Sequence, residues 1–274
     1  MHYSSEKIYF SGGGITHIHT SFSKDGRYSL EVIGDYIHRN LKSGYFAIAD
    51  HLTSPYKEKP FSSEIAGIKI RDMTVAAEAY NKKRDMAPPC VPGVEVNIMP
   101  GGLDIPNDVL SSIDYVVASR HFPWGTEEPQ LFEENVLEAL ANPHVDVIGH
   151  IDRYAPGNVD WLKLMRRAKE TKTIIEINID SPPRLQILEL MAKLELPLVL
   201  GTDFHSFNGW VKKSNSETSD EEQVTPLGMS LLKPVLSITK KLVGVGIMAE
   251  QIVNIKNYYQ FIELLKTKKY ERNF

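Results

Sequence analysis

Two histidines separated by one residue, His17 and His19, are the first residues of this 274-residue chain whose types and spacing suggest chemistry. They end a short apolar stretch that follows three glycines. Side chains at positions i and i+2 of a strand point to the same face, so a strand here would hold the two imidazoles side by side. Neighbouring imidazole nitrogens are a common part of a metal site. One such pair is weak evidence, and the prediction depends on what the rest of the chain supplies.

Alternating strands and helices would have to position these histidines. Apolar runs bounded by turn residues predict seven strands, at 14–18, 45–51, 91–98, 114–119, 145–149, 173–179 and 196–201. Helical spacing predicts helices at 29–43, 63–85, 127–141, 159–171, 182–194 and 247–266, with a turn and short helix at 103–113 and a fraying tail from Lys266. The repeats have no break in composition, which favours a single barrel-like parallel sheet wrapped by helices.

More residues of metal-binding type fall at, or just past, the predicted strand ends. The C-terminal ends of parallel strands converge on one face of a barrel, where sites are built. An aspartate in the first loop lies within reach of the same face. The set comprises His17, His19, Asp25, His51, Glu95, His121, His150, Asp203 and His205. Burying so many ionisable groups together is costly unless something pairs with them, and divalent cations are the obvious partner.

Short motifs surround these residues in a recurring order. They are His17-Ile18-His19 with Asp25-Gly26, Ala49-Asp50-His51, Gly93-Val94-Glu95, Ser119-Arg120-His121, Gly149-His150, Glu176-Ile177-Asn178 and Thr202-Asp203-Phe204-His205. In these motifs the chain resembles the PHP (polymerase and histidinol phosphatase) phosphoesterases. The likeness covers about residues 14–206, which leaves 207–274 as a closing loop and helices. It is strongest to stand-alone relatives of the PHP module found in bacterial family X DNA polymerases.

The resemblance implies an α/β fold with a distorted TIM-like (β/α)7 barrel, formed as a single domain by residues 1–274. It also implies up to three divalent ions, which could be Zn, Mn or Fe. By position, one ion is held by His17, His19, Glu95 and Asp203, a second by bridging Glu95 with His121 and His150, and a third by Asp25, His51 and His205. The residues we expect to be catalytic are His17, His19, Glu95, Asp203 and His205. Phe204 departs from the family pattern, which usually has a small residue there.

The charge of such a site indicates its substrate. Three carboxylates and six neutral imidazoles carry −3, and three divalent ions carry +6, so the loaded site would be about +3. This favours an anionic phosphate ester, attacked by a water whose pKa the metals lower toward about 7. Arginine can hold phosphate oxygens with two parallel hydrogen bonds. The candidate substrate-binding residues are Arg120, Arg153, Asn178 and Arg184.

The leading hypothesis is a metal-dependent phosphomonoesterase acting on a small phosphorylated metabolite, such as histidinol phosphate or a sugar or nucleotide phosphate. A nucleic-acid 3′-end phosphatase or exonuclease is an alternative, although the net charge of −4 weighs mildly against it. An amidohydrolase-type C–N hydrolase also uses His-x-His on its first strand, but this chain lacks an obvious bridging lysine. A non-catalytic barrel is the remaining alternative, which a full set of ligands disfavours.

Composition places limits on the class of protein. With 42% hydrophobic and 24% charged residues, the chain is typical of globular proteins. The single cysteine, Cys90, cannot form an intramolecular disulfide, and we expect it to be buried. The N-terminus has no signal-peptide pattern and no apolar run reaches about 18 residues, so we expect a cytoplasmic protein without a membrane span. Residues 212–223 are strongly polar and predict a flexible surface loop near the barrel mouth, for which a plain disordered insertion is favoured over a lid.

Overall fold

The computed structural model describes residues 13–41, 43–52, 62–121, 127–206, 238 and 241–272. Its strands are β1 (Gly14–Ile18), β2 (Tyr45–Ile48), β3 (Asp50–His51), β4 (Cys90–Val91), β5 (Gly93–Met99), β6 (Gly102–Leu103), β7 (Tyr115–Ser119), β8 (Val147–Ile148), β9 (Ile174–Asn178) and β10 (Leu198–Phe204). Its helices are α1 (Leu30–Asn40), α2 (Ser63–Lys83), α3 (Asn107–Leu110), α4 (Pro129–Ala141), α5 (Trp161–Glu170), α6 (Leu185–Lys193) and α8 (Tyr258–Arg272). Two 3-10 turns, η2 (Ala249–Gln251) and η3 (Val253–Ile255), precede α8.

The described strands form one sheet that curls round on itself. Its order is β3-β5-β7-β8-β9-β10-β1-β2-β4, with all of these neighbours parallel and β6 added antiparallel to β5. The predicted strand at 45–51 is broken at Ala49 into β2 and β3, and that at 91–98 is broken at Pro92 into β4 and β5. Proline lacks the N–H that a strand ladder needs, which accounts for the second break. At one end of this strand order β3 pairs with β5, and at the other end β2 pairs with β4. The two predicted strands, 45–51 and 91–98, therefore pair with each other at both ends of the sheet. The predicted TIM-like α/β architecture is confirmed.

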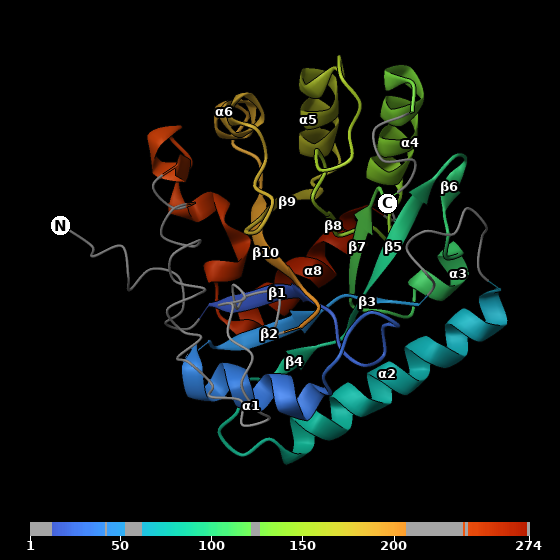
Figure 1. Ribbon diagram of the computed structural model, residues 1–274, viewed down its shortest axis with the longest axis vertical. Coiled ribbons are helices and arrows are strands. Elements are labelled where there is room, and N and C mark those ends of the chain that lie inside the picture. Colours follow the sequence, from blue (N-terminus) through green and yellow to red (C-terminus); the bar gives the residue numbers. More distant parts are fainter. Residues whose placement is uncertain are drawn as a thin grey trace, which may run out of the picture.

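Helices cover the outside of this curled sheet. In Figure 1, α1 and α2 lie along one side, α4, α5 and α6 stand next to one another on the other side, and the red α8 crosses behind the strands. The main hydrophobic core lies between strands and helices and includes Ile33 and Ile37 of α1 and Met73 of α2. Ser29 caps α1 and Asp160 caps α5, each by accepting a hydrogen bond from a backbone N–H of the first turn.

A second core fills the inside of the barrel. Residues at every second strand position face inward, and Tyr115 and Val117 of β7 belong to this inner core. Phe261 of α8 stacks near Tyr45 and Tyr115, with ring centroids 5.0 and 5.9 Å away, so α8 closes the N-terminal end of the barrel. Further along β7, the same two-residue spacing reaches Ser119 and then His121. The inner face therefore changes from apolar to polar at the C-terminal ends of the strands.

The C-terminal segment differs from the sequence-based expectation. The helix predicted at 247–266 is confirmed from Tyr258 onward as α8, but residues 249–251 and 253–255 form the 3-10 turns η2 and η3 instead. There the amide of Asn254 bonds the backbone of Gly14 and Leu200, which joins β1 to β10 and holds the segment in an irregular path. The fraying predicted from Lys266 is also wrong, since α8 continues to Arg272. Its lysine Lys269 donates hydrogen bonds to backbone carbonyls of residues 113 and 114.

Composition led to three further expectations. Cys90 is fully buried, as predicted. Across the described parts of the chain, the helices are either too short or too polar for a membrane span. The polar stretch at 212–223 lies outside the described residues.

Candidate metal centre

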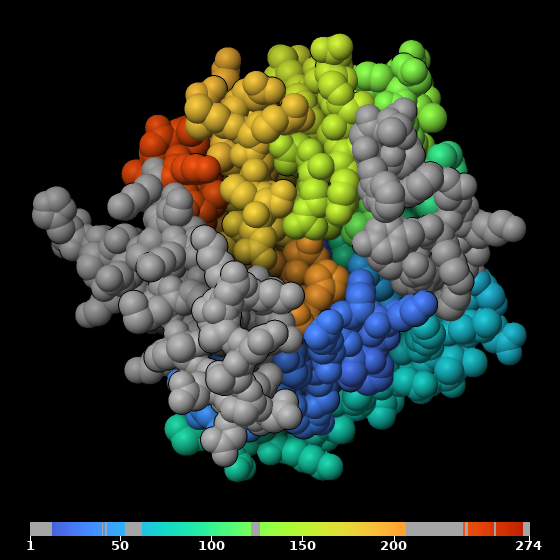
Figure 2. All heavy atoms as spheres, in the orientation of Figure 1, coloured from blue at the N-terminus to red at the C-terminus, as the bar shows by residue number. Residues whose placement is uncertain are grey.

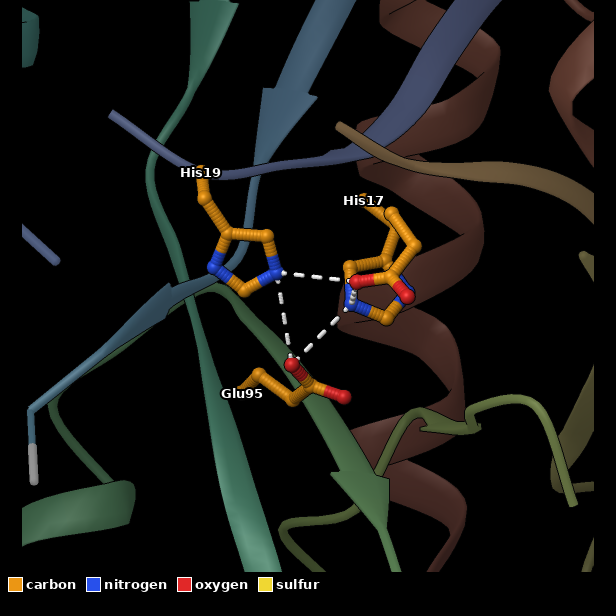
Figure 3. A group of neighbouring side chains, drawn as sticks. His17, His19 and Glu95 are labelled. Atoms are coloured by element: carbon orange, nitrogen blue, oxygen red, sulfur yellow. Dashed lines mark ion pairs between the residues drawn. The ribbon is translucent and has the colours of Figure 1, made fainter. Parts of the chain in front are cut away.

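His17 and His19 both point toward the carboxylate of Glu95 from the end of β1 (Figure 3). Their Nε2 atoms lie 3.2 and 3.4 Å from Glu95 Oε2. The strand that carries them is not regular, however. His17 has a φ of +60°, and the pairing of β1 with β10 shifts between Thr16 and Ile18. The imidazoles converge as predicted, but through a bulge rather than through the simple alternation of a strand.

The facing strand β10 contains the matching irregularity. Its register advances three residues, from Gly201 to Phe204, while β1 advances two, and Asp203 adopts a φ of +48°. Asp203 Oδ1 consequently lies 3.6 Å from His17 Nε2, 3.4 Å from His19 Nε2 and 3.1 Å from His205 Nε2. Left-handed backbone at a residue other than glycine costs on the order of 1–3 kcal/mol and is concentrated at functional sites.

Glu95 lies at the centre of the cluster. This side chain on β5 is buried, and its two oxygens face histidines from different strands. Oε2 is 3.1 Å from His51 Nε2 in addition to the two histidines of β1, and Oε1 is 3.0 Å from His150 Nε2 and 3.5 Å from His121 Nε2. One carboxylate is thus shared by five imidazoles, a geometry suited to bridging two cations.

All nine predicted ligands come together at this end of the barrel. Potential ligand atoms lie within 4.8 Å of one another in three overlapping groups, which are His17, His19, Glu95 and Asp203, then His19, Asp25 and His51, then His51, Glu95 and His121. His205 Nδ1 lies 3.6 Å from Asp25 Oδ2 at the exposed rim. In Figure 2 the orange atoms from the end of β10 are seen between blue atoms of the N-terminal segment and yellow-green atoms of the segment after β8.

The cluster has the chemistry of a cation site. Among the described residues, His17 Nε2, His19 Nε2 and Glu95 Oε2 are buried without a hydrogen-bond partner, although they face one another. A buried polar atom without a partner costs roughly 1–3 kcal/mol. A divalent cation among them would satisfy all three atoms, so the residues present fit a metal centre.

The pKa values of the cluster lead to the same conclusion. Burial raises the pKa of Glu95, but the surrounding imidazoles outweigh burial and hold this pKa well below its ordinary value. Burial lowers the pKa of His51 to about 4 and that of His121 to about 3, so both are neutral near pH 7, in the form that binds a metal. For His17, burial is outweighed by Glu176 and Glu95, which raise its pKa well above the ordinary value.

Several orienting residues were not identified as site residues from the sequence. His19 Nδ1 lies 3.2 Å from Ser23 Oγ, and this hydroxyl donates to Asp50 Oδ1 at 2.8 Å. Asp50, which the sequence left open between a turn and an orienting role, also accepts from the backbone and hydroxyl of Thr20. It therefore organises the loop that follows β1.

A parallel arrangement supports His121. Its Nδ1 lies 2.8 Å from Asn97 Oδ1, and the amide of Asn97 donates to Asp104 Oδ2 at 2.7 Å. Asn97 follows Glu95 by two residues on β5, so the inward alternation of the strand could have identified it. Glu176 occupies the same kind of inward position on β9 and bonds His17 Nδ1 at 2.6 Å. Strand alternation could not have identified the contact between Glu176 and His17, because the two residues are 159 positions apart in the sequence.

The predicted substrate-binding residues differ in where they lie. Arg153 donates a hydrogen bond from Nη1 to Asp203 Oδ2 and is partly exposed, so it lies at the edge of the cluster. Arg184 instead bonds Asp152 and lies over the ring of Trp161, 5.3 Å from its centroid. Asn178 Oδ1 accepts two backbone N–H groups of the loop that follows β9, which gives it a capping role.

Arg120 has a structural role instead of a place at the substrate. Its Nε and Nη2 donate to the two carboxylate oxygens of Glu127, at 3.0 and 2.7 Å, and its Nη1 donates to the carbonyl of Ile98. The pair is buried, with 7% and 3% of the two side chains exposed. Because the guanidinium is committed to these partners, we do not retain Arg120 as a phosphate contact.

Replacing Arg120 with alanine should lower the free energy of unfolding by about 3–5 kcal/mol, because Glu127 would be left buried and unpaired. Chemical denaturation measures this change. Arg39→Ala is a matched control, since Arg39 and Asp35 form an exposed pair expected to contribute less than about 1 kcal/mol. A stable Arg120→Ala protein with weakened substrate binding would contradict the structural role.

Fold and cluster together define a TIM-like α/β protein with a site of histidines and carboxylates able to hold metal ions. No protein-family model matches the chain. It is 36% identical to a probable phosphatase of Clostridium novyi in a 131-residue alignment that covers 41% of this chain and 51% of that protein. It is 31% identical to the DNA polymerase/3′-5′ exonuclease PolX of Bacillus subtilis over 205 residues, 70% of this chain and 34% of that protein. The chain thus spans about half, or less, of the length of these curated relatives.

A solved structure shares the fold. Histidinol phosphate phosphatase from Lactococcus lactis, crystallised with zinc, L-histidinol and phosphate, matches with a TM-score of 0.56 over 86% of this chain and 95% of that one. Sequence identity is 15%, so this match bears on the fold alone. With the phosphatase and PolX relatives, the comparisons confirm the resemblance to PHP-type phosphoesterases.

Proposed function

We propose that this protein is a metal-dependent phosphoesterase, most specifically a phosphomonoesterase that hydrolyses a small phosphorylated metabolite such as histidinol phosphate or a sugar or nucleotide phosphate. The observation that carries the proposal is the group of nine ligand-type side chains gathered around the shared carboxylate of Glu95. Relatives named as probable phosphatases support the reaction class. A cytoplasmic location stays a prediction.

The residues divide between holding ions and handling substrate. His17, His19, Glu95 and Asp203 would hold one ion, and the remaining ligands would hold up to two more, which could be Zn, Mn or Fe. Ions bound there would supply an activated water at neutral pH and stabilise the charge of the phosphoryl group. Buried Glu95 would be shared by the ions, and because the side chains of His51 and His121 are neutral, the loaded site would carry net positive charge.

Arg153 is the candidate that best fits a phosphate contact. Its guanidinium lies beside Asp203 at the edge of the cluster, where Nη1 already donates to a carboxylate oxygen. An anionic substrate oxygen near this position could accept from the remaining guanidinium donors, and such charge-assisted hydrogen bonds are short and strong. Arg184 is less favoured because its contacts are with Asp152 and Trp161.

A phosphatase or exonuclease acting on nucleic-acid 3′ ends is the second candidate. The match to PolX supports it, because it covers 70% of this chain. The substrate would then be a terminal phosphate or a diester, so the chemistry at the metal centre would be of the same class.

Measuring turnover of a phosphomonoester and a phosphodiester separates the two candidates. The protein loaded with Mn²⁺ or Zn²⁺ should hydrolyse the monoester. His17→Ala should abolish this turnover, because it removes a candidate metal ligand and leaves a cavity in the buried cluster. Preferential diester turnover would favour nucleic-acid ends. Loaded protein without turnover of either ester would contradict the phosphoesterase proposal and favour C–N bond hydrolysis.

A further inference from the structure

Glu176 is a buried carboxylate that touches the cluster without belonging to any of the three ligand groups. From β9, its Oε1 lies 2.6 Å from His17 Nδ1, and its Oε2 accepts a hydrogen bond from the backbone N–H of His150 at 2.7 Å. Each oxygen of Glu176 therefore contacts a candidate ligand residue, one at the imidazole of His17 and the other at the backbone N–H of His150. The carboxylate is in position to orient those groups.

The strand next to β9 makes room for this carboxylate. A Cβ atom placed on Gly201 of β10 would lie 1.7 Å from Glu176 Oε1, far inside van der Waals contact. Any larger residue at position 201 would therefore displace Glu176 or push the strands apart. The glycine is required by the close approach of the carboxylate.

The contact with Glu176 determines which nitrogen of His17 faces the cluster. A carboxylate beside Nδ1 keeps a proton on that atom, so Nε2, which faces Glu95 and Asp203, would be the nitrogen available to a cation. A carboxylate partner also makes an imidazole a stronger metal ligand. In this way Glu176 would act through His17 on an ion bound there.

The other supported histidines have neutral partners instead. His19 Nδ1 faces the hydroxyl of Ser23, and His121 Nδ1 faces the amide oxygen of Asn97. In both cases a carboxylate lies one hydrogen bond further away. Direct carboxylate support is thus specific to His17 among these three histidines.

We propose that Glu176 is a positioning residue that makes the group formed by His17, His19, Glu95 and Asp203 the tightest cation site, which fills before the sites that contain His121. The inference rests on the proposed metal centre and adds an order of loading to it. Its physical basis is the difference between a charged and a neutral partner at Nδ1 of the ligand histidine.

Glu176→Gln is the sharpest test of this role. Glutamine has nearly the same shape but only one acceptor oxygen, whereas Glu176 faces two donors, His17 Nδ1–H and the His150 N–H. One donor must then face an NH2 group, or the His17 proton must move to Nε2, where it would block the cation. Loss of an orienting partner of this kind typically weakens metal affinity about 10- to 100-fold.

The experiment titrates the metal-stripped 274-residue chain with Zn²⁺ in competition with a chromophoric chelator. The wild-type protein should bind one ion more tightly than the others. Glu176→Gln should weaken that step by about 10- to 100-fold and leave the later steps unchanged, whereas Asn97→Ala should weaken a later step. Gly201→Ala leaves Glu176 in the sequence but pushes its carboxylate away from His17, so this variant should reproduce the Glu176→Gln result.

Glu133→Gln provides the matched control. Glu133 is another buried carboxylate, but it accepts from the Asp160 N–H and from Lys163 on the outer helices. The Glu133→Gln protein should bind Zn²⁺ with the same affinities as the wild-type protein. Unchanged tight binding in Glu176→Gln, or equal weakening of every step, would overturn the proposed role of Glu176. Failure of the wild-type protein to bind Zn²⁺ would instead overturn the metal centre itself, so the two failures are distinguishable.

Discussion

Replacing Glu95 with glutamine is expected to lower phosphomonoester turnover by at least about a thousandfold, equivalent to roughly 4 kcal/mol of transition-state stabilisation. Glu95 Oε2 faces three imidazoles and Oε1 faces two more, so this residue joins the parts of the cluster. Glutamine keeps the shape but removes the charge that would attract and bridge the cations. The measurement is kcat for a monoester with saturating Mn²⁺ or Zn²⁺.

The control for this variant has to separate chemistry from folding. Glu133→Gln makes the same chemical change at a buried carboxylate of α4 and should leave turnover near the wild-type value. Thermal unfolding of both variants shows whether each is folded at the assay temperature. A folded Glu95→Gln protein with turnover within tenfold of wild type would be incompatible with a bridging role for Glu95.

Removing divalent ions should abolish turnover and lower the thermal stability of the protein together. Only folding brings the histidines and carboxylates of the cluster close together, so ions that bind to them stabilise the folded state. An ion present at about a thousand times its Kd contributes about 4 kcal/mol. For a chain of this size that corresponds to a difference in Tm of roughly 10 °C.

Thermal scans and turnover assays check this prediction, with the stripped protein compared before and after Mn²⁺ or Zn²⁺ is restored. Mg²⁺ is an informative comparison, because it prefers oxygen ligands in octahedral geometry and this cluster is rich in imidazole. Restored ions should return both turnover and Tm. Equal Tm and turnover with and without ions would contradict the metal centre.

That the nine candidate ligands gather at one end of the barrel could be predicted from the sequence because they obey local rules. Strands such as β1 and β7 are short apolar runs, and ligands at or beyond the ends of parallel strands meet on one face of the sheet. The inner face of a regular strand follows a period of two, which in β7 places His121 two residues after Ser119. Both rules depend only on neighbours along the chain.

Backbone irregularities were beyond those rules. The positive φ values of His17 and Asp203 arise where β1 and β10 advance by different numbers of residues, which is a property of the pair and not of either strand. The first part of the helix predicted at 247–266, before Tyr258, was wrong for a similar reason. Apolar spacing favoured a helix, but Asn254 pairs with β1 and β10, strands that lie far away in the chain.

The sequence by itself therefore determined the alternation of strands and helices and the set of residues that gather at the barrel mouth. Only the tertiary structure decided how those residues are shared and supported. Glu176 reaches His17 across 159 positions of sequence, and Arg120, a predicted phosphate contact, is bound to Glu127. Local periodicity fixes which face a side chain occupies, whereas the partner it meets on that face depends on strand register and on close approaches such as that at Gly201.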